Sequence, residues 1–464
     1  MAPPLGDGAV LGYTLLRSCP MPGRRYFERM VAMSRAVSFR ESLAFMRGNI
    51  LVLTLTRVLG QFARSLAFPY ASLYILSLGG QPAQIGWINS LAPLAGLLAF
   101  PLAGYLSDHA GRVRLIGLAG FFSAFIYLLY ALAPGWQVIA LATLLNGLAV
   151  AQFPPTSAII ADSLAPAERS RGIAIINSIA GAPAMIAPYV AGNLLKNVDV
   201  NLGMRLLYGS ITIAYGISAY VNLRCLRETS PTASSHLSLG EIPGVLRRAY
   251  SGIPALLRQF TRPLRVLAVV LILGFVANAI AGPFWVVYAI EHIGLSSAEW
   301  GLILLVENIL RTVGYLPAGI LSDRLGRTPT LLLSLLLTAL SVPFFIGAQG
   351  FWPVLVLRAV VGVSNALLMP ASAALLADLT PREVRGRVMA AIGRGTVMIG
   401  AASGGTGGPG LGFLVTLPLM VAAFAAGYLY EADPRLPWYL LSGILALCLA
   451  LTALYIRDPK RAEA

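Results

Sequence analysis

The chain has 464 residues, of which 57% are hydrophobic and 11% are charged, and its mean hydropathy is +0.76. A soluble domain of this length needs many more charges to cover its surface, so the composition excludes a soluble globular protein. The formal net charge is +15, but the arginines lie in short segments between apolar runs, which indicates membrane orientation and not nucleic-acid binding. Three scattered cysteines and three histidines predict no metal site, no disulfide framework and no cofactor.

Apolar runs long enough to cross a bilayer as helices recur along the chain. In lipid the backbone must satisfy its own hydrogen bonds, and these runs are too long and too continuous for barrel strands. The sequence therefore predicts an all-α membrane protein with twelve transmembrane helices. We place the spans at about 49–78, 83–106, 113–133, 136–161, 171–195, 204–224, 264–290, 298–321, 328–348, 352–377, 410–430 and 437–456.

The remaining sequence divides around these spans. We expect an N-terminal extension, a first half, a central segment, a second half and a tail, at 1–47, 48–224, 225–262, 263–457 and 458–464. Residues 1–47 hold seven arginines and form a basic extension. Residues 241–260 mix apolar residues with arginine, a pattern that fits an amphipathic helix on the membrane surface or a flexible linker between the halves.

The distribution of basic residues predicts the orientation. One set of loops, together with both tails, holds 27 of the 34 arginine and lysine residues, whereas the opposite loops hold only Lys196, Arg205 and Arg435. Loops on the cytoplasmic side carry the excess of basic residues. We therefore expect a multi-pass protein of the cell membrane with both termini in the cytoplasm.

An internal repeat sets the topology. The sequence GYLSDHAGR at Gly104–Arg112 returns as GILSDRLGR at Gly319–Arg327, 215 residues later. Both copies lie in arginine-rich loops, so an even number of spans separates them, and the twelve helices form two parallel halves of six. Such halves place a substrate site between them near the midplane. Later in the chain the step between matching positions grows by about twenty residues, which we place in the Gly-rich stretch Gly400–Gly412.

The doubled motif resembles the signature loop of the major facilitator superfamily. The loop that follows the fourth span, which begins at Asp162 and again at Asp378, is similar to that of drug-efflux members and proton antiporters. The resemblance implies a monomeric transporter in the lipid bilayer that works by alternating access. It also implies a small-molecule substrate, protons as the coupling ion, and no enzymatic activity.

The same resemblance implies two ion-pair latches that hold one conformation and break as the halves rock. Arg112 and Arg327 would each bridge to a carboxylate at the end of a fourth span, and the motif glycines would serve close packing and helix ends where φ is positive. The alternative is that these residues only anchor the topology. The expected latch residues are Gly104, Asp108, Gly111, Arg112, Asp162, Gly319, Asp323, Gly326, Arg327 and Asp378.

The first span carries the sharpest candidates for a binding site. Arg57, Gln61 and Arg64 are spaced i, i+4 and i+7 and so share one helix face. A charge at mid-membrane normally faces a cavity or a partner. We interpret Arg64, and next Arg57, as an anion-binding or gating arginine; the alternative is a structural pair with a carboxylate.

The second half offers matching polar residues. Glu307, Asn308 and Arg311 lie within about one turn of the eighth span, and the i, i+4 spacing of Glu307 and Arg311 predicts an ion pair. The alternative is that Glu307 binds the proton that is coupled to transport. The repeat aligns Asn278 with Arg64, and the tenth span adds two further polar candidates, Arg358 and Asn365.

These features predict a secondary active transporter of small organic solutes. The first choice is proton-coupled efflux of drug-like or metabolite molecules, because the loop patterns are similar to that branch of the family. The alternative suggested by Arg57 and Arg64 is uptake or exchange of a small organic anion. A receptor or scaffold that kept the fold without transport is the alternative from another class.

Overall fold

The computed structural model describes residues 45–109, 111–166, 168–229, 244, 251–393, 397–399 and 412–458. Most of the basic N-terminal extension, much of the central segment, nearly all of Gly400–Gly412 and the end of the tail lie outside this part of the chain. The described residues form an all-α bundle, which confirms the predicted fold class.

The first half consists of six membrane-length segments, two of which are broken by a short 3-10 turn. In chain order they are α4 with η1 and α5 (Asn49–Ala67, Phe68–Tyr70, Ala71–Ser77), α6 (Pro82–His109), α7 (Arg112–Leu132), α8 with η2 and α9 (Trp136–Leu148, Ala149–Gln152, Phe153–Asp162), α10 (Arg169–Asn197) and α11 (Val200–Cys225).

The second half repeats this order. Its segments are α14 with η4 and α15 (Arg262–Ala281, Gly282–Phe284, Trp285–Glu291), α16 (Ser297–Leu325), α17 (Arg327–Ile346), α18 (Phe351–Asp378), α19 with α20 (Arg385–Ile392, Phe413–Ala432) and α21 (Leu436–Tyr455). The breaks in the first and seventh spans correspond, because Pro69 and Pro283 each interrupt helical hydrogen bonding there. Eleven segments of the described chain are long and apolar enough to cross a membrane, and α6, with 28 residues, has the required length as well.

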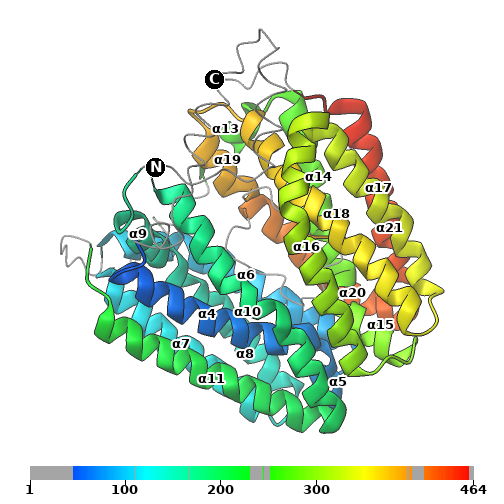
Figure 1. Ribbon diagram of the computed structural model, residues 1–464, viewed down its shortest axis with the longest axis horizontal. Coiled ribbons are helices and arrows are strands. Elements are labelled where there is room, and N and C mark those ends of the chain that lie inside the picture. The colour runs from blue at the N-terminus through cyan, green and yellow to red at the C-terminus, as the bar shows by residue number, and fades with distance from the viewer. Residues whose placement is uncertain are drawn as a thin grey trace, which may run out of the picture.

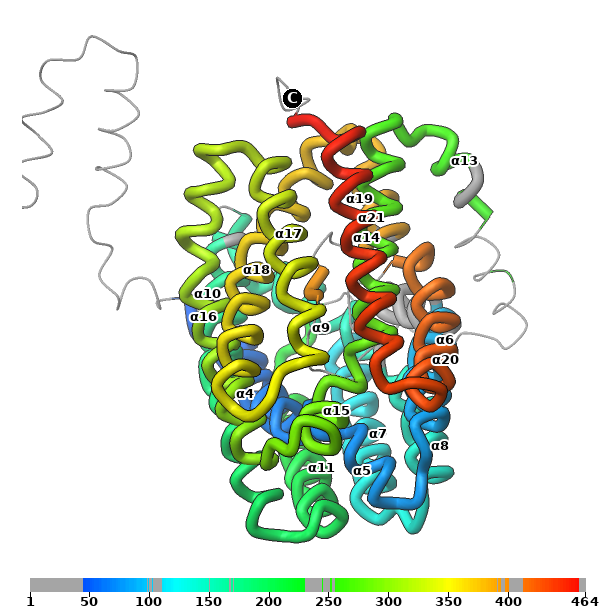
Figure 2. Tube along the Cα trace, turned by 90° about the vertical axis from the view of Figure 1, so that its right-hand side faces the viewer, coloured from blue at the N-terminus to red at the C-terminus, as the bar shows by residue number. Residues whose placement is uncertain are grey.

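Figure 1 groups the first half, blue to green, apart from the second half, yellow-green to red. The halves meet along two pairs of helices, α6 with α20 and α10 with α16, which also lie side by side in Figure 2. By the repeat, α6 corresponds to α16 and α10 to α20. The interface is therefore built twice from equivalent helices. We call the end of the bundle that carries Arg112 and Arg327 the arginine-rich end.

At the opposite end, glycines let the halves come into backbone contact. A Cβ atom at Gly86 would lie 2.7 Å from the carbonyl oxygen of Ala423, and one at Gly301 would lie 2.6 Å from that of Pro188. The partner helices contribute Gly427 and Gly192 at the same contacts. Small residues that allow close helix approach are typical of membrane interfaces. The two halves are thus closed against each other at this end.

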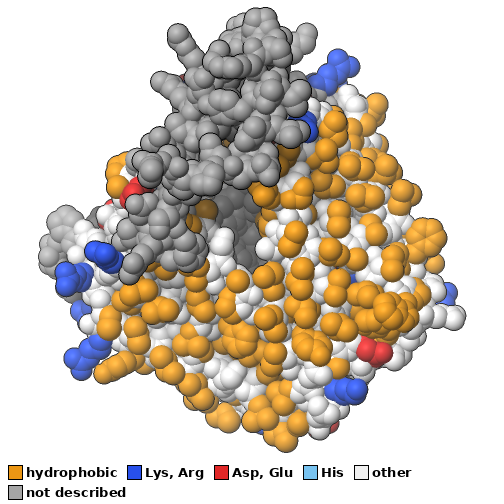
Figure 3. Space-filling model, in the orientation of Figure 1, with side chains coloured by type: hydrophobic (Ala, Val, Ile, Leu, Met, Phe, Trp, Pro, Cys, Tyr) orange, Lys and Arg blue, Asp and Glu red, His pale blue; other side chains and the backbone are white. Residues whose placement is uncertain are grey.

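Large apolar side chains cover the outer surface of the bundle. Leu316 is 74% exposed and Trp352 is 73% exposed, which suits contact with lipid. Figure 3 shows hydrophobic side chains spread over one face, with lysine and arginine side chains gathered at its margins. This distribution fits a bundle that spans a bilayer.

The eleventh span is interrupted where the repeat predicts extra residues. Helix α19 ends at Ile392 and α20 begins at Phe413, so the inserted stretch is 393–412 and starts seven residues before the predicted Gly400. A Cβ at Gly412 would collide with the backbone of Ala391 and Ile392, so the two ends of the insertion lie in contact. The described residues 397–399 return into the bundle, where Val397 and Ile399 are buried.

The central segment is partly helical. Helix α13 (Ile253–Arg258) contacts α19, and Leu256 and Phe260 are buried in the protein. This part of 241–260 is therefore docked on the second half and is not a free linker. Residues 241–243 and 245–250 lie outside the described chain, and the membrane-surface interpretation stays a prediction.

The glycine contacts predict a selective effect on stability. Gly192→Ala should lower the thermal midpoint of the purified protein, because the new Cβ meets backbone and Tyr70 atoms and costs about 1–3 kcal/mol of strain. Gly209→Ala is the matched control, since nothing lies within 4 Å of a Cβ at that helical position. Equal midpoints for the two variants would contradict the close packing at this end.

Candidate functional site

The first half holds Arg64 among tyrosines. Its guanidinium lies 4.7 Å from the centre of the Phe68 ring. It donates a hydrogen bond to Tyr215, and Tyr127 and Tyr130 lie beside it. The ion pairs found in the described part of the chain all involve other arginines. The positive charge of Arg64 therefore faces aromatic rings and hydroxyl groups, and no carboxylate of the described residues pairs with it.

The tyrosines around Arg64 form a continuous stack between α7 and α11. The ring centroids of Tyr127 and Tyr215 are 5.0 Å apart, and those of Tyr130 and Tyr208 are 4.8 Å apart. Tyr127 and Tyr130 are three residues apart on α7, so they share a helix face. Aromatic stacking of this kind holds the hydroxyl groups in fixed positions. Our sequence analysis did not identify these residues, because aromatic residues in apolar spans are ordinary.

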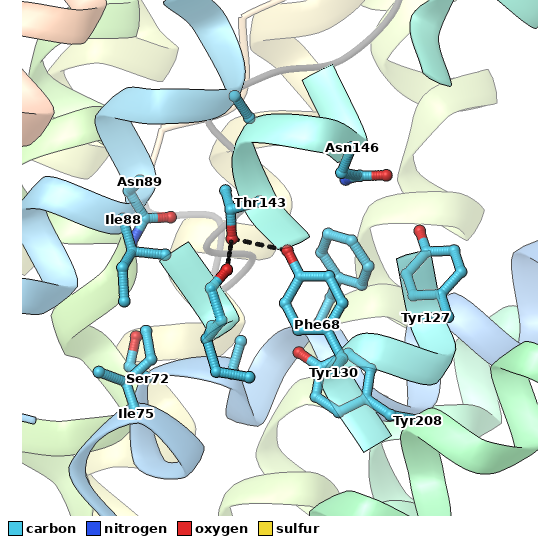
Figure 4. A pocket seen from close by; sticks show the side chains of 13 residues that line it. Phe68, Ser72, Ile75, Ile88, Asn89, Tyr127, Tyr130, Thr143, Asn146 and Tyr208 are labelled. Atoms are coloured by element: carbon cyan, nitrogen blue, oxygen red, sulfur yellow. Dashed lines mark hydrogen bonds between the residues drawn. The ribbon is translucent and has the colours of Figure 1, made fainter. Parts of the chain in front are cut away.

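A cavity of about 60 Å³ lies next to this stack (Figure 4). Five of the six helical spans of the first half line it, and its polar lining comes from tyrosine, threonine, serine and asparagine. The lining residues are Phe68, Ala71, Ser72, Ile75, Ile88, Asn89, Ala92, Tyr127, Tyr130, Ile139, Thr143, Asn146 and Tyr208. Within it, Thr143 donates to the Ile139 carbonyl (2.8 Å), and its hydroxyl lies 2.6 Å from that of Tyr130.

The second half has a buried ion pair instead. The Glu307 carboxylate accepts a 2.5 Å hydrogen bond from Arg358 Nη2, and both side chains are almost fully buried. The Arg358 guanidinium lies 4.5 Å from the Trp285 ring centre and 5.6 Å from that of Trp300. Cation–π contact and the carboxylate together stabilise the charge. Sequence analysis named Glu307 and Arg358 separately and did not pair them.

The predicted ion pair between Glu307 and Arg311 is wrong. Arg311 Nη2 donates to Asn308 Oδ1 at 2.7 Å, and Arg311 Nη1 lies 3.4 Å from the sulfur of Met398. The i, i+4 spacing allows contact along one helix, but Arg358 offers Glu307 a fully buried partner on the neighbouring helix α18. An unpaired charge on the fully buried Arg358 would cost more free energy than one on the half-buried Arg311, so the cross-helix pair prevails over the local spacing.

Asn365 has a structural partner. Its amide nitrogen donates to the Ile399 carbonyl (2.8 Å), and its oxygen accepts from the Ile399 N–H (2.9 Å). These two bonds satisfy the backbone of the inserted stretch where it enters the bundle, which is required of non-helical backbone at membrane depth. Asn365 therefore holds the insertion in place. Asn278 is half-buried in α14, and Arg57 and Gln61 are exposed on α4, away from the cavity.

The arginine-rich end contains both expected ion pairs. Arg112 bridges to Asp162, and Arg327 bridges to Asp378. Each pair joins elements of one half. Asp323 is exposed, and the surroundings of Gly104 and the Asp108 side chain lie outside what the structure describes. Whether these pairs act as a conformational latch stays a prediction.

Two further carboxylates, absent from our sequence analysis, occupy the starts of the third helices. Glu228 accepts from the Val113 N–H (3.0 Å), and Asp458 accepts from the Thr328 N–H (2.8 Å). Each lies three residues after the sixth helix of its half. A carboxylate there complements the helix dipole. A regular signal, an acidic residue at the same distance from both sixth spans, was available in the sequence.

The carboxylates of Glu228 and Asp458 explain why glycine is needed at Gly111 and Gly326. A Cβ at Gly111 would lie 3.2 Å from the Glu228 carboxylate, and a Cβ at Gly326 would collide with Asp458. Gly326 has φ of 99°, as a helix end of this kind predicts. Gly111 has φ of −58°, so its expected positive φ is wrong, and room for Glu228 is the reason for glycine there. Gly319 is a helical residue of α16 with nothing within 4 Å of an added Cβ, so the close packing expected there is wrong.

Known proteins of this architecture match the chain in sequence and in structure. The sequence model of the Major Facilitator Superfamily matches residues 53–281 and 267–464. The chain is 21% identical to an uncharacterized MFS-type transporter of Methanocaldococcus jannaschii, over 88% of this chain and 94% of that one. It is 25% identical to the multidrug resistance protein MdtG of Escherichia fergusonii, over 83% and 89%. The nucleoside transporter NupG has a similar structure, with a TM-score of 0.63 at 13% identity over 88% of this chain and all of NupG.

The buried ion pair predicts a non-additive effect on stability. Glu307→Gln should destabilise the protein by about 3–5 kcal/mol, because it leaves the Arg358 charge buried without its partner. The double variant Glu307→Gln/Arg358→Met should recover most of this loss, since no unpaired charge remains. Thermal or denaturant unfolding of the purified variants measures both. A double variant as unstable as the sum of its single variants would contradict the pairing.

Proposed function

The chain belongs to the Major Facilitator Superfamily and is a membrane transporter of small solutes; on this premise we propose that it exports small organic molecules by alternating access, coupled to protons. The observation that carries this proposal is the interface between the halves. Two equivalent helix pairs meet through glycine contacts at one end of the bundle. Such an interface supports rocking of the halves about a central site.

Similarity to multidrug resistance proteins supports the export of drug-like or metabolite molecules. The two arginine–aspartate pairs at the arginine-rich end are proposed to latch one of the two conformations. Proton coupling needs a carboxylate whose partner changes between conformations. Glu307 is the buried carboxylate of the described spans, and we assign it this role, with proton uptake as it separates from Arg358.

One observation favours a second candidate, the transport of small organic anions. Arg64 carries a charge at membrane depth that no carboxylate of the described residues neutralises. Such residues normally face a cavity or a substrate path. An anionic substrate would supply the missing charge.

We also propose that the arginine-rich end faces the cytoplasm, in the cell membrane, as the excess of basic residues indicates. Lys196 and Arg324 are exposed residues at opposite ends of the bundle. In a variant without native cysteines, Lys196→Cys in intact cells should react with a membrane-impermeant maleimide, and Arg324→Cys should react only after the cells are opened. The reverse pattern would overturn the orientation.

Alternating access predicts that joining the halves stops transport. Trp87 Nε1 on α6 donates to the Tyr428 hydroxyl on α20 at 2.9 Å, so the cysteine-free variant carrying Trp87→Cys and Tyr428→Cys can be bridged by a bifunctional methanethiosulfonate. In proteoliposomes, bridging should abolish the flux of ethidium and of radiolabelled benzoate, and reduction should restore it. A pH gradient should accelerate flux in the unbridged protein.

The two single-cysteine variants, treated with the same reagent, are the controls. Undiminished flux through the bridged protein would contradict the rocking of the halves. Flux that does not respond to the pH gradient would contradict proton coupling. Failure of every solute to cross would favour a receptor or scaffold.

A further inference from the structure

The cavity of the first half lies where the second half holds its ion pair. The repeat places Thr143 on α8 against Arg358 on α18, 215 residues later, and Ala92 on α6 against Glu307 on α16 at the same step. Ala71 and Trp285 are each the first residue after the 3-10 break in their span. All three small residues, Ala71, Ala92 and Thr143, line the cavity.

The cavity thus results from replacement of three large side chains by small ones. In the second half, Arg358, Glu307 and Trp285 fill the equivalent space, and the charges of the first two neutralise each other. In the first half, alanine, threonine and alanine leave it open. The space that Glu307, Arg358 and Trp285 fill in the second half is therefore the space that stays open in the first half.

The cavity lies next to Arg64, which does not itself line it but shares three neighbouring residues with it. Phe68, Tyr127 and Tyr130 both line the cavity and surround the guanidinium. In the described part of the chain, the side-chain amide of Asn146 and the hydroxyl of Tyr208 have no hydrogen-bond partner, and both belong to the cavity wall (Figure 4). Two hydrogen-bonding groups without partners therefore belong to the cavity wall, and a positive charge lies behind the rings that line it.

The size of the cavity limits what it can hold. Drug-sized ligands need about 300–1,000 Å³, so 60 Å³ accommodates only an end group. The nearby charge of Arg64 and the hydrogen-bond donors favour a small anionic group, and the same charge disfavours a second cation. Helices α7 and α11 supply part of the wall, so this space lies inside the first half, behind the interface with the second half.

We propose that this cavity is a subsite for the carboxylate of an organic substrate, with Arg64 as its counter-ion. The substrate's carboxylate would accept hydrogen bonds from Arg64 and from the groups of the wall, while the rest of the molecule remains between the halves. The equivalent space of the second half is closed by Glu307, Arg358 and Trp285, so only one half receives the charged group. The proposal rests on the transport function proposed above.

Benzoate, benzamide and benzamidine test this subsite, because they share a shape and carry a negative, no and a positive charge. Their dissociation constants are measured by calorimetry with the purified full chain at neutral pH. We expect benzoate to bind at least tenfold more tightly than the other two. Arg64→Gln should remove this preference, and Arg64→Lys should retain part of it.

Two further variants separate a binding role from a structural one. Ala92→Leu fills the cavity and should weaken benzoate at least tenfold without lowering the thermal midpoint. Arg224→Gln removes an exposed arginine of the same half that stacks on Tyr220, and should leave benzoate affinity unchanged. Equal binding of the three probes, or unchanged benzoate affinity in Arg64→Gln, would overturn the subsite.

Ethidium flux in proteoliposomes distinguishes the two proposals. If ethidium crosses the membrane while benzoate does not bind, the subsite is wrong and the transport function stands. If neither ethidium nor benzoate crosses, the transport function fails and the subsite with it. Loss of benzoate binding in Arg64→Gln together with unchanged ethidium flux supports the subsite.

Discussion

The cost of keeping a guanidinium inside a bilayer is the constraint on which the arrangement of both halves depends. On insertion scales an arginine at the centre of a span costs about 3 kcal/mol, so each buried arginine needs a compensating environment. Arg358 has one within the protein, since it pairs with Glu307 and lies against two tryptophan rings. Arg64 has aromatic rings, hydroxyl groups and an adjoining cavity. The charge of Arg358 is therefore enclosed by protein groups, whereas the charge of Arg64 lies beside a cavity.

In the proposed transport cycle, this difference gives two structurally equivalent halves different tasks. The backbone path is shared, including the proline breaks at Pro69 and Pro283 and the glycine contacts that join the halves. The proposed rocking of the halves depends on these shared features. The proposed recognition of substrate depends on positions where the repeat diverges, because large neutralised side chains fill one half and small ones leave a pocket in the other. The inserted stretch 393–412, held by Asn365, adds a further asymmetry to the second half.

Much of the fold was predictable from sequence, because hydropathy and a nine-residue repeat are signals that tertiary contacts do not change. The ion pairs of Arg112 and Arg327 were also predictable, since each carboxylate ends a neighbouring span. The partner of Glu307 was not, because local spacing favoured Arg311 while burial beside Arg358 decided the outcome. The cavity was hidden for a different reason: Thr143 and Ala92 matter through the volume they lack, which shows only once the surrounding helices are packed. Glu228 and Asp458 escaped notice because they lie in loops outside every motif.

In the proposed transport cycle, the first half receives the charged group of the substrate at Arg64. The most direct measurement is a cryo-electron microscopy structure of the full chain with 4-iodobenzoate, in which the carboxylate and the heavy iodine fix the orientation of the ligand. We expect carboxylate density within hydrogen-bond distance of the Arg64 guanidinium, beside the cavity lined by Thr143 and Tyr208. Ligand density beside Arg311, or elsewhere with an empty cavity, would contradict it.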